Sequence, residues 1–135
     1  MSNYITYRNT LIKLSSLLIC LIPLALLTGP FLPDLFLTCI VIIFIFFTLK
    51  ENLWEKYYRN IYSIIAFIFF FYLLLSSVFS ENITSSLETS IFYFRFIIFS
   101  LSVWFLINHD KSLIKKFSIC LLITFILALT DGIFQ

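Results

Sequence analysis

The stretch that decides the fold is residues 61–79, which read IYSIIAFIFFFYLLLSSVF and contain no charged side chain. A helix needs about 20 predominantly apolar residues to cross the hydrocarbon core of a bilayer. This stretch has that length and composition, so it predicts a membrane-spanning helix. The rest of the chain can then be searched for segments of the same kind.

Four further apolar runs share this character. They are residues 14–29, 31–49, 90–107 and 113–130. A Gly/Pro turn at residues 29–34, two charged segments and one Ser-rich acidic segment separate the runs. We therefore expect one domain over residues 1–135, an all-α polytopic membrane protein with about five transmembrane helices.

Composition gives the same indication. Of the 135 residues, 61% are apolar and 12% are charged, against roughly half and a quarter in soluble domains. No basic patch interleaved with aromatic side chains is present, which argues against nucleic acid as a partner. Cys20, Cys39 and Cys120 lie scattered within apolar runs, so they predict neither a disulfide framework nor a metal site.

The basic residues predict an orientation. Eight of the nine Lys and Arg residues lie in three segments, namely the N-terminal segment and residues 50–60 and 108–116. The first and third loops and the C-terminal end carry none. Because cytoplasmic loops are enriched in Lys and Arg, this alternation predicts a cytoplasmic N-terminus and an external Gln135.

The ninth basic residue, Arg95, lies inside an apolar run. If its helix starts at Ser90, Arg95 lies roughly 7 Å below the outer end and leans outward. Glu88, Arg95 and Ser102 are spaced by seven, which favours a face turned toward protein. Arg95 and Glu88 are thus candidate contacts for an anionic lipid headgroup or a partner, and anchoring of the helix by a snorkelling Arg95 is the alternative.

Other chemistry is absent from the sequence. There is no Gly-rich phosphate loop, no nucleophile beside a base and no carboxylate pair within the apolar runs. His109 stands alone beside Asp110 in a basic loop, which is typical of a solvated residue. We therefore predict no catalytic residue, no metal site and no cofactor in this chain.

One segment resembles a known family. Residues 73–82, LLLSSVFSEN, lead into Ser85-Ser86-Leu87, and residues 91–96, IFYFRF, follow. This resembles the N-terminal part of the O-antigen ligase and polymerase family of bacterial envelope glycan enzymes. There a helix commonly ends in a Ser-rich outer loop, and an aromatic segment with an arginine starts the next helix. Residues 21–34 and 131–135 are similar to that family as well.

The resemblance implies a multi-pass protein of the bacterial inner membrane that acts in lipopolysaccharide biosynthesis. Such a ligase transfers glycan from an undecaprenyl pyrophosphate carrier to lipid A-core in the periplasm. It needs no metal or nucleotide, because the lipid pyrophosphate is the leaving group. Of the family's contacts to anionic lipid, the resemblance implies one counterpart in this chain, at Arg95. The implied partners are membrane lipid and the undecaprenyl pyrophosphate-linked glycan.

The chain departs from the family in length. Members have about a dozen spans and a large periplasmic loop that carries the histidine and most of the arginines associated with transfer. The chain resembles a truncated or split member that lacks this catalytic half, so we expect no glycosyl transfer from it alone. The alternative is a small non-enzymatic membrane protein whose helices pack against a larger membrane partner.

Overall fold

The computed structural model describes the backbone of residues 2–134 and the side chains of residues 4–133. The helices in this range are α1 (Ser2–Leu26), α2 (Phe31–Glu51), α3 (Trp54–Tyr57), α4 (Ile61–Val78), α5 (Ile83–His109) and α6 (Leu113–Phe134). Five of the helices described, all except α3, are long and apolar enough to cross a membrane. The predicted all-α fold with about five membrane-spanning helices is confirmed.

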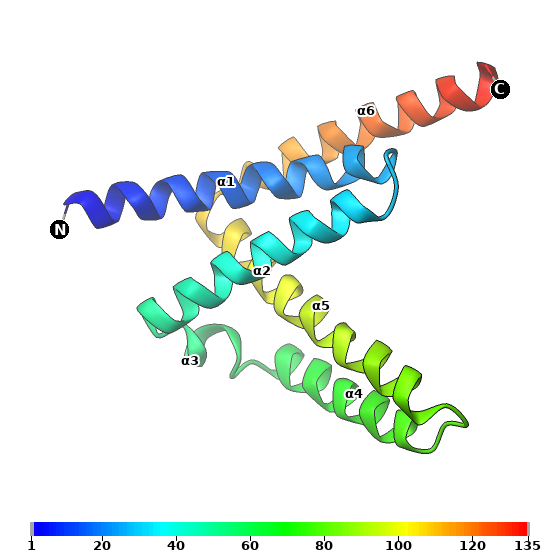
Figure 1. The fold of residues 1–135 in the computed structure, drawn as a ribbon. Helices are drawn as coiled ribbons and strands as arrows, with labels where there is room; N and C mark the ends of the chain where they lie inside the picture. The colour runs from blue at the N-terminus through cyan, green and yellow to red at the C-terminus, as the bar shows by residue number, and fades with distance from the viewer. Residues whose placement is uncertain (1, 135) are drawn as a thin grey trace.

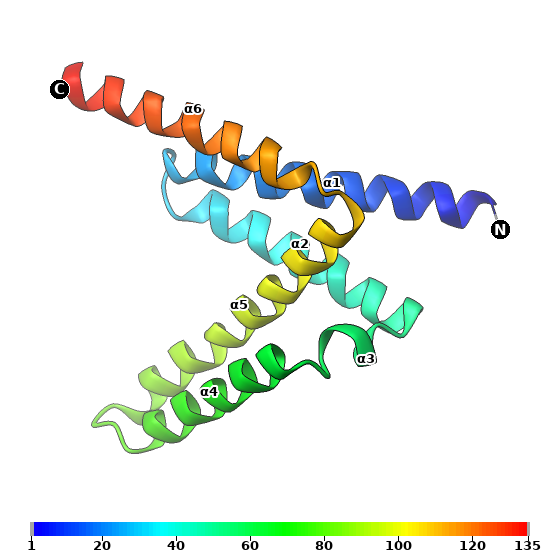
Figure 2. The same ribbon diagram turned by 180° about the vertical axis from the view of Figure 1, so that it is seen from behind.

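The long helices alternate in direction along the chain (Figure 1). The N-terminus, the α2–α4 connection and the α5–α6 connection lie at one end, which we call the basic end. The α1–α2 and α4–α5 turns and the C-terminus lie at the other, which we call the turn end (Figures 1 and 2). Basic connections thus gather at one end, and the side of the membrane that each end faces stays a prediction.

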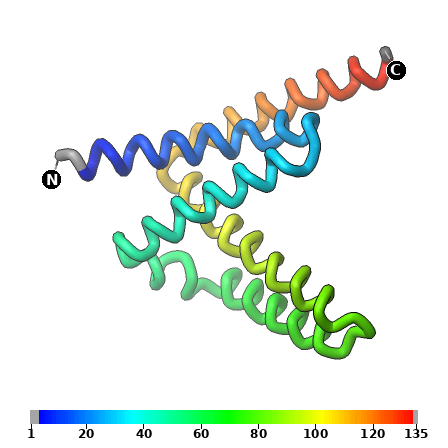
Figure 3. The backbone as a smooth tube through the Cα atoms, in the orientation of Figure 1, coloured from blue at the N-terminus to red at the C-terminus, as the bar shows by residue number. Residues whose placement is uncertain are grey.

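The helices form two groups that diverge toward the turn end (Figure 3). One group contains α1, α2 and α6, with α1 packed on both of the others. The other is the α4–α5 hairpin, whose α5 also packs across α2. Because α4 and α6 lie at the margins, only 17% and 11% of their most apolar windows are buried.

The core lies where α1, α2 and α5 meet, toward the basic end. Phe44 and Phe47 of α2 each place their ring centroid 5.6 Å from that of Phe105 on α5. The short helix α3 turns Tyr57 back into this cluster, where it is 0% exposed and packs edge-on against Trp104. Offset and edge-to-face rings of this kind stabilise a core beyond the area that they bury.

Buried hydroxyl groups occur at the helix contacts. Ser15 of α1 and Ser102 of α5 are both buried beside the aromatic core. Ser77 of α4 and Ser90 of α5 hydrogen-bond to each other across their hairpin. Small hydroxyl residues let membrane helices approach closely. The hydroxyl of Ser102 bonds to the backbone, whereas that of Ser15 has no partner among the described residues.

Two helices begin earlier than the apolar runs predicted. The first run starts at residue 14, but α1 begins at Ser2, and the fourth run starts at residue 90, but α5 begins at Ile83. Hydropathy detects only the part of a helix that lies in hydrocarbon, whereas the backbone hydrogen bonds of a helix continue into water. Pro23 likewise lies inside a continuous α1 and does not divide it.

The turn predicted at residues 29–34 is partly confirmed: the chain reverses at residues 27–30, and residues 31–34 already form the first turn of α2. Gly29 adopts a φ of +118°, a conformation that side chains with a Cβ rarely take. Pro30 then precedes the first residue of α2, Phe31. This reversal places Asp34 in the first turn of α2, at the turn end of the bundle.

Candidate functional site

The central feature of the turn end is an ion pair between α5 and α2. The Arg95 Nη1 atom donates to Asp34 Oδ2 at 2.8 Å, and Nη2 contacts Asp34 Oδ1. Both terminal nitrogens of the guanidinium therefore face one carboxylate, a bidentate arrangement that fixes direction as well as charge. The pair connects the two helix groups where they begin to diverge.

The remaining surroundings of Arg95 leave one donor without a partner. Its guanidinium carbon lies 5.7 Å from the Phe92 ring centroid and 5.3 Å from that of Phe96, within cation–π range. Thr38 Oγ1 lies 3.5 Å from Nη1, at the limit of a hydrogen bond. Nε is buried and has no hydrogen-bond partner among the described residues.

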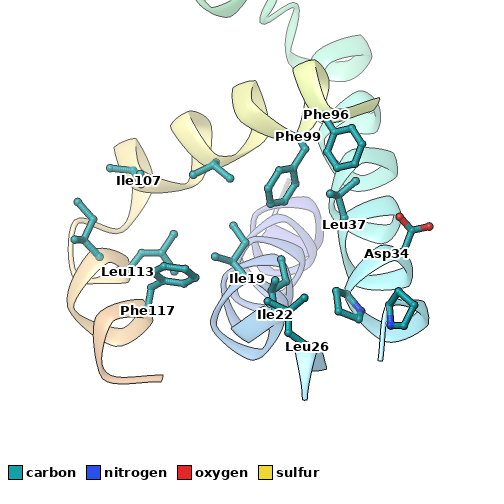
Figure 4. A pocket seen from close by; sticks show the side chains of 14 residues that line it. Ile19, Ile22, Leu26, Asp34, Leu37, Phe96, Phe99, Ile107, Leu113 and Phe117 are labelled. Carbon is teal, nitrogen blue, oxygen red and sulfur yellow. The ribbon is translucent and has the colours of Figure 1, made fainter. Parts of the chain in front are cut away.

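An apolar cleft of about 480 Å³ lies beside this pair, between α1, α2, α5 and α6 (Figure 4). Its lining side chains are Ile19, Ile22, Leu26, Pro30, Pro33, Asp34, Leu37, Phe96, Phe99, Val103, Ile107, Leu113, Ile114 and Phe117. Asp34 is the one polar residue among them, and its carboxylate lies at the edge and points away from the apolar walls (Figure 4). The charged pair thus stands at the margin of a cleft suited to a hydrocarbon chain.

The earlier start of α5 does not change the depth predicted for Arg95. Arg95 lies about 18 Å along the axis of α5 counted from Ile83, but residues 83–89 precede the apolar run, so it stays roughly 7 Å below the outer end of that run. An arginine within a span is costly without a partner, and the carboxylate of Asp34 lowers that cost.

Glu88 does not join this site. It is exposed, and its carboxylate makes no hydrogen bond or ion pair with any described residue. Ser102, which shares its predicted face, is buried at 1% exposure and donates to the carbonyl of Phe99. Of the three residues spaced by seven on α5, Arg95 and Ser102 therefore face protein, whereas Glu88 does not.

A second polar cluster occupies the basic end. Arg8 Nε donates to Glu51 Oε1 at 2.6 Å, and Nη2 donates to Oε2 at 3.3 Å. The Tyr4 hydroxyl donates to the same carboxylate at 3.1 Å. Arg8 Nη2 also lies 2.7 Å from His109 Nε2. The cluster links the start of α1 to the ends of α2 and α5.

Both ring nitrogens of His109 have close partners. A guanidinium can only donate, so Nε2 faces a donor in Arg8. Nδ1 lies 3.1 Å from the carbonyl oxygen of Phe105, which can only accept. His109 is exposed, as predicted, but it is the last residue of α5 and is hydrogen-bonded.

Asp110 follows in the α5–α6 connection. It accepts from Lys116 Nζ at 2.8 Å and from both the backbone and the hydroxyl of Ser112. The bond from Lys116 and those from Ser112 lower the pKa of Asp110 to about 2. This carboxylate is consequently charged at any physiological pH.

The geometry of the turn end suits the binding of an anion. Within the described residues no group of three His, Cys, Asp or Glu side chains is placed to hold a metal ion. The three cysteines have free thiols. What the turn end offers is a fixed guanidinium next to a hydrocarbon-lined space.

Sequence reasoning identified Arg95 but missed Asp34. The available signal was that an arginine within a span requires a counter-charge and that Asp34 begins a span at the same end. The basic-end cluster was also missed, because Arg8, Glu51 and His109 are far apart in the chain. Comparison with known proteins gave no match to any family model, curated protein or solved structure.

Proposed function

We propose that this chain forms the N-terminal membrane portion of an O-antigen ligase-like glycosyltransferase of the bacterial inner membrane. Its part in the reaction is to hold the undecaprenyl pyrophosphate carrier while glycan passes to lipid A-core. The observation that supports this proposal is the Arg95–Asp34 pair at the margin of the apolar cleft.

The two parts of the site suit the two parts of such a carrier. The cleft, with Leu37, Phe96 and Phe99 among its walls, can take a segment of isoprenoid chain. The planar guanidinium of Arg95 can donate two parallel hydrogen bonds to a phosphate and stays charged at any relevant pH. Its Nε, buried without a partner, is one further donor for an incoming oxygen.

Asp34 acts in this proposal as a stand-in for the ligand. Its side chain is 48% exposed, so it can rotate toward water more readily than the partly buried Arg95, at 27%. A pyrophosphate carries more negative charge than one carboxylate and competes for the same nitrogen atoms. The pair then keeps Arg95 oriented and neutralised until an anionic headgroup arrives.

The test uses a complete enzyme that carries this segment, with surface glycan attachment and membrane abundance measured together. Arg95→Leu should reduce attachment at least about tenfold while abundance holds, because one charge-assisted contact is worth about 1.4 kcal/mol or more. Arg95→Lys should fall between, since it keeps charge but loses the fork. Arg59→Leu removes an exposed arginine from the basic end and serves as the matched control. Full attachment with Arg95→Leu would remove Arg95 from the site.

A non-enzymatic role as a packing partner is the second candidate. It is favoured by α6, whose most apolar window is only 11% buried and which carries a shallow groove lined in part by Ser118, Thr124 and Ala128. Small and hydroxyl residues of this kind are common where membrane helices meet. The downstream reading frame discriminates: further spans with a large outer loop favour the ligase, and a stop codon followed by unrelated genes favours the packing partner.

A further inference from the structure

A second cleft lies near the basic end of the bundle. Its volume is about 620 Å³, and α1 supplies most of its wall. The end of α5 and the first turns of α6 close it through His109, Asp110 and Lys116. Nothing in the proposed glycan transfer uses this space, so its chemistry needs an explanation of its own.

The wall from α1 changes character along the helix. Asn9, Lys13 and Ser16 follow at spacings of four and three, which places them on one face. Leu17 and Cys20 continue the wall further into the span. From Asn9 to Cys20 the helix rises about 16 Å, so the cleft is polar near the membrane surface and apolar below it. A ligand with a polar head and a hydrocarbon tail matches this order.

Ser16 gives the second and independent indication of a ligand. It is only 9% exposed, and its hydroxyl is buried without a hydrogen-bond partner among the described residues. Buried polar groups in native proteins are nearly always paired, so an unpaired hydroxyl lining a cleft is the position of a missing acceptor or donor. Ser15 is unpaired too, but it faces the packed contact with α5, where no ligand fits.

The charged side chains that line the cleft predict the charge of its ligand. Lys116 is paired with Asp110, and the His109 ring is already in contact with the Arg8 guanidinium. Lys13 is exposed and forms no ion pair with any residue that the structure describes. Two lysines against one aspartate leave one net positive charge, which one phosphodiester balances.

We propose that this cleft binds the phosphodiester headgroup of an anionic glycerophospholipid from the leaflet at the basic end. Lys13 and Ser16 donate to the phosphate oxygens, and an acyl chain follows Leu17 and Cys20 toward the bilayer centre. Basic pockets between membrane helices are known to hold anionic headgroups in this way. A soluble phosphate ester would have no use for the apolar half of the cleft.

The test measures lipid retention by the intact chain. The protein is placed in mixed micelles with equal amounts of phosphatidylglycerol and phosphatidylcholine, and the lipids that stay bound are counted by native mass spectrometry. Wild-type protein should retain phosphatidylglycerol preferentially. Lys13→Gln should lower its apparent affinity about tenfold, the value of one charge-assisted contact of about 1.4 kcal/mol. Lys13→Arg should keep most of it.

Two control variants make the result specific. Lys111→Gln removes the same charge from an exposed position outside the cleft and should leave retention within about twofold. Ser16→Ala should lower retention yet raise the thermal stability of the lipid-free protein, because it removes an unpaired buried hydroxyl. Equal retention of phosphatidylcholine, unchanged affinity in Lys13→Gln, or equal stabilisation by inorganic phosphate would each overturn the assignment to an anionic lipid.

Discussion

The two arginine–carboxylate pairs of this protein, one at each end of the bundle, differ in how completely they are satisfied. Arg8 and Glu51 belong to the adjacent helices α1 and α2, are 25% and 21% exposed, and share further bonds with Tyr4 and His109. Arg95 and Asp34 join helices from diverging groups, and Asp34 is 48% exposed. Only the second pair has a buried nitrogen without a partner and an apolar cleft beside it.

This difference separates a structural role from a binding role. A pair whose donors and acceptors are all used cannot take a ligand without first losing bonds that hold helices together. A pair with a spare donor and an exposed partner can exchange that partner for an anion at little loss of packing. The function of a charged residue in a membrane protein therefore depends less on where it lies than on whether its hydrogen-bond donors and acceptors all have partners.

The largest expected contrast is in the accessibility of the two ends to a membrane-impermeant reagent, because the two pairs should lie on opposite sides of the membrane. In a variant with the native cysteines replaced by serine, new cysteines at Pro33 and Ser85 should react with an impermeant maleimide in intact cells. Cysteines at Asn52 and Ser112 should react only after lysis. Labelling of Asn52 in intact cells would contradict the orientation predicted from the basic loops and would place Arg8 outside.

The next largest effect should come from the aromatic core, which lies toward the basic end. Phe105 is 1% exposed and touches the rings of Phe44, Phe47 and Tyr57, so Phe105→Ala should destabilise the protein by about 3 kcal/mol or more. Phe125→Ala on α6 removes the same group from a side chain that is 62% exposed. Thermal unfolding in detergent, followed by loss of monodisperse protein, measures both.

The two outcomes discriminate between packing and lipid contact. Phe125 has no core to leave empty, so its replacement should change stability by less than about 1 kcal/mol. Equal losses for both variants would mean that α6 is packed against something other than lipid, for instance a second protein. In that event the exposed face of α6 would become the leading candidate for a functional surface.

Much of the fold could be predicted from single apolar runs, because the bilayer fixes the length of a spanning helix and alternation fixes its direction. Residues 61–79 closely match α4, Ile61–Val78. The starts of α1 and α5 could not be predicted in this way, since Ser, Thr and Asn continue a helix outside hydrocarbon without any hydropathy signal. The short α3 was missed because its four residues are polar and aromatic.

The sites were harder to predict for a different physical reason. Arg95 stood out because an arginine in a span demands a partner, but the choice of Asp34 depends on which helices are neighbours. The same holds for Lys13 and Ser16, whose significance appears only when α6 brings Lys116 beside α1. Spacing along one helix defines a face, and only tertiary packing determines what that face meets.

The smallest expected effect is on the coupling energy between each arginine and its carboxylate. This energy also gives the most direct comparison of the two pairs. Glu51→Ala leaves Arg8 without its main acceptor, and we expect a loss of about 2 kcal/mol, the usual range for hydrogen bonds to charged groups. Asp34→Ala should cost about 1 kcal/mol or less, because the freed guanidinium of Arg95 lies close enough to the outer interface to reach water.

A double-mutant cycle for each pair separates this coupling from the cost of each truncation. The cycles use Arg8→Leu with Glu51→Ala, and Arg95→Leu with Asp34→Ala, each measured by thermal unfolding in one detergent. If the basic-end pair is structural, its coupling should exceed that of the turn-end pair by about 1 kcal/mol. Removing both Arg95 and Asp34 should leave stability near that of the wild type, since no charge then remains unpaired in the span. A coupling at Arg95–Asp34 as large as that at Arg8–Glu51 would show that this pair fastens the two helix groups together, and an incoming anion could not then displace Asp34 without opening the bundle.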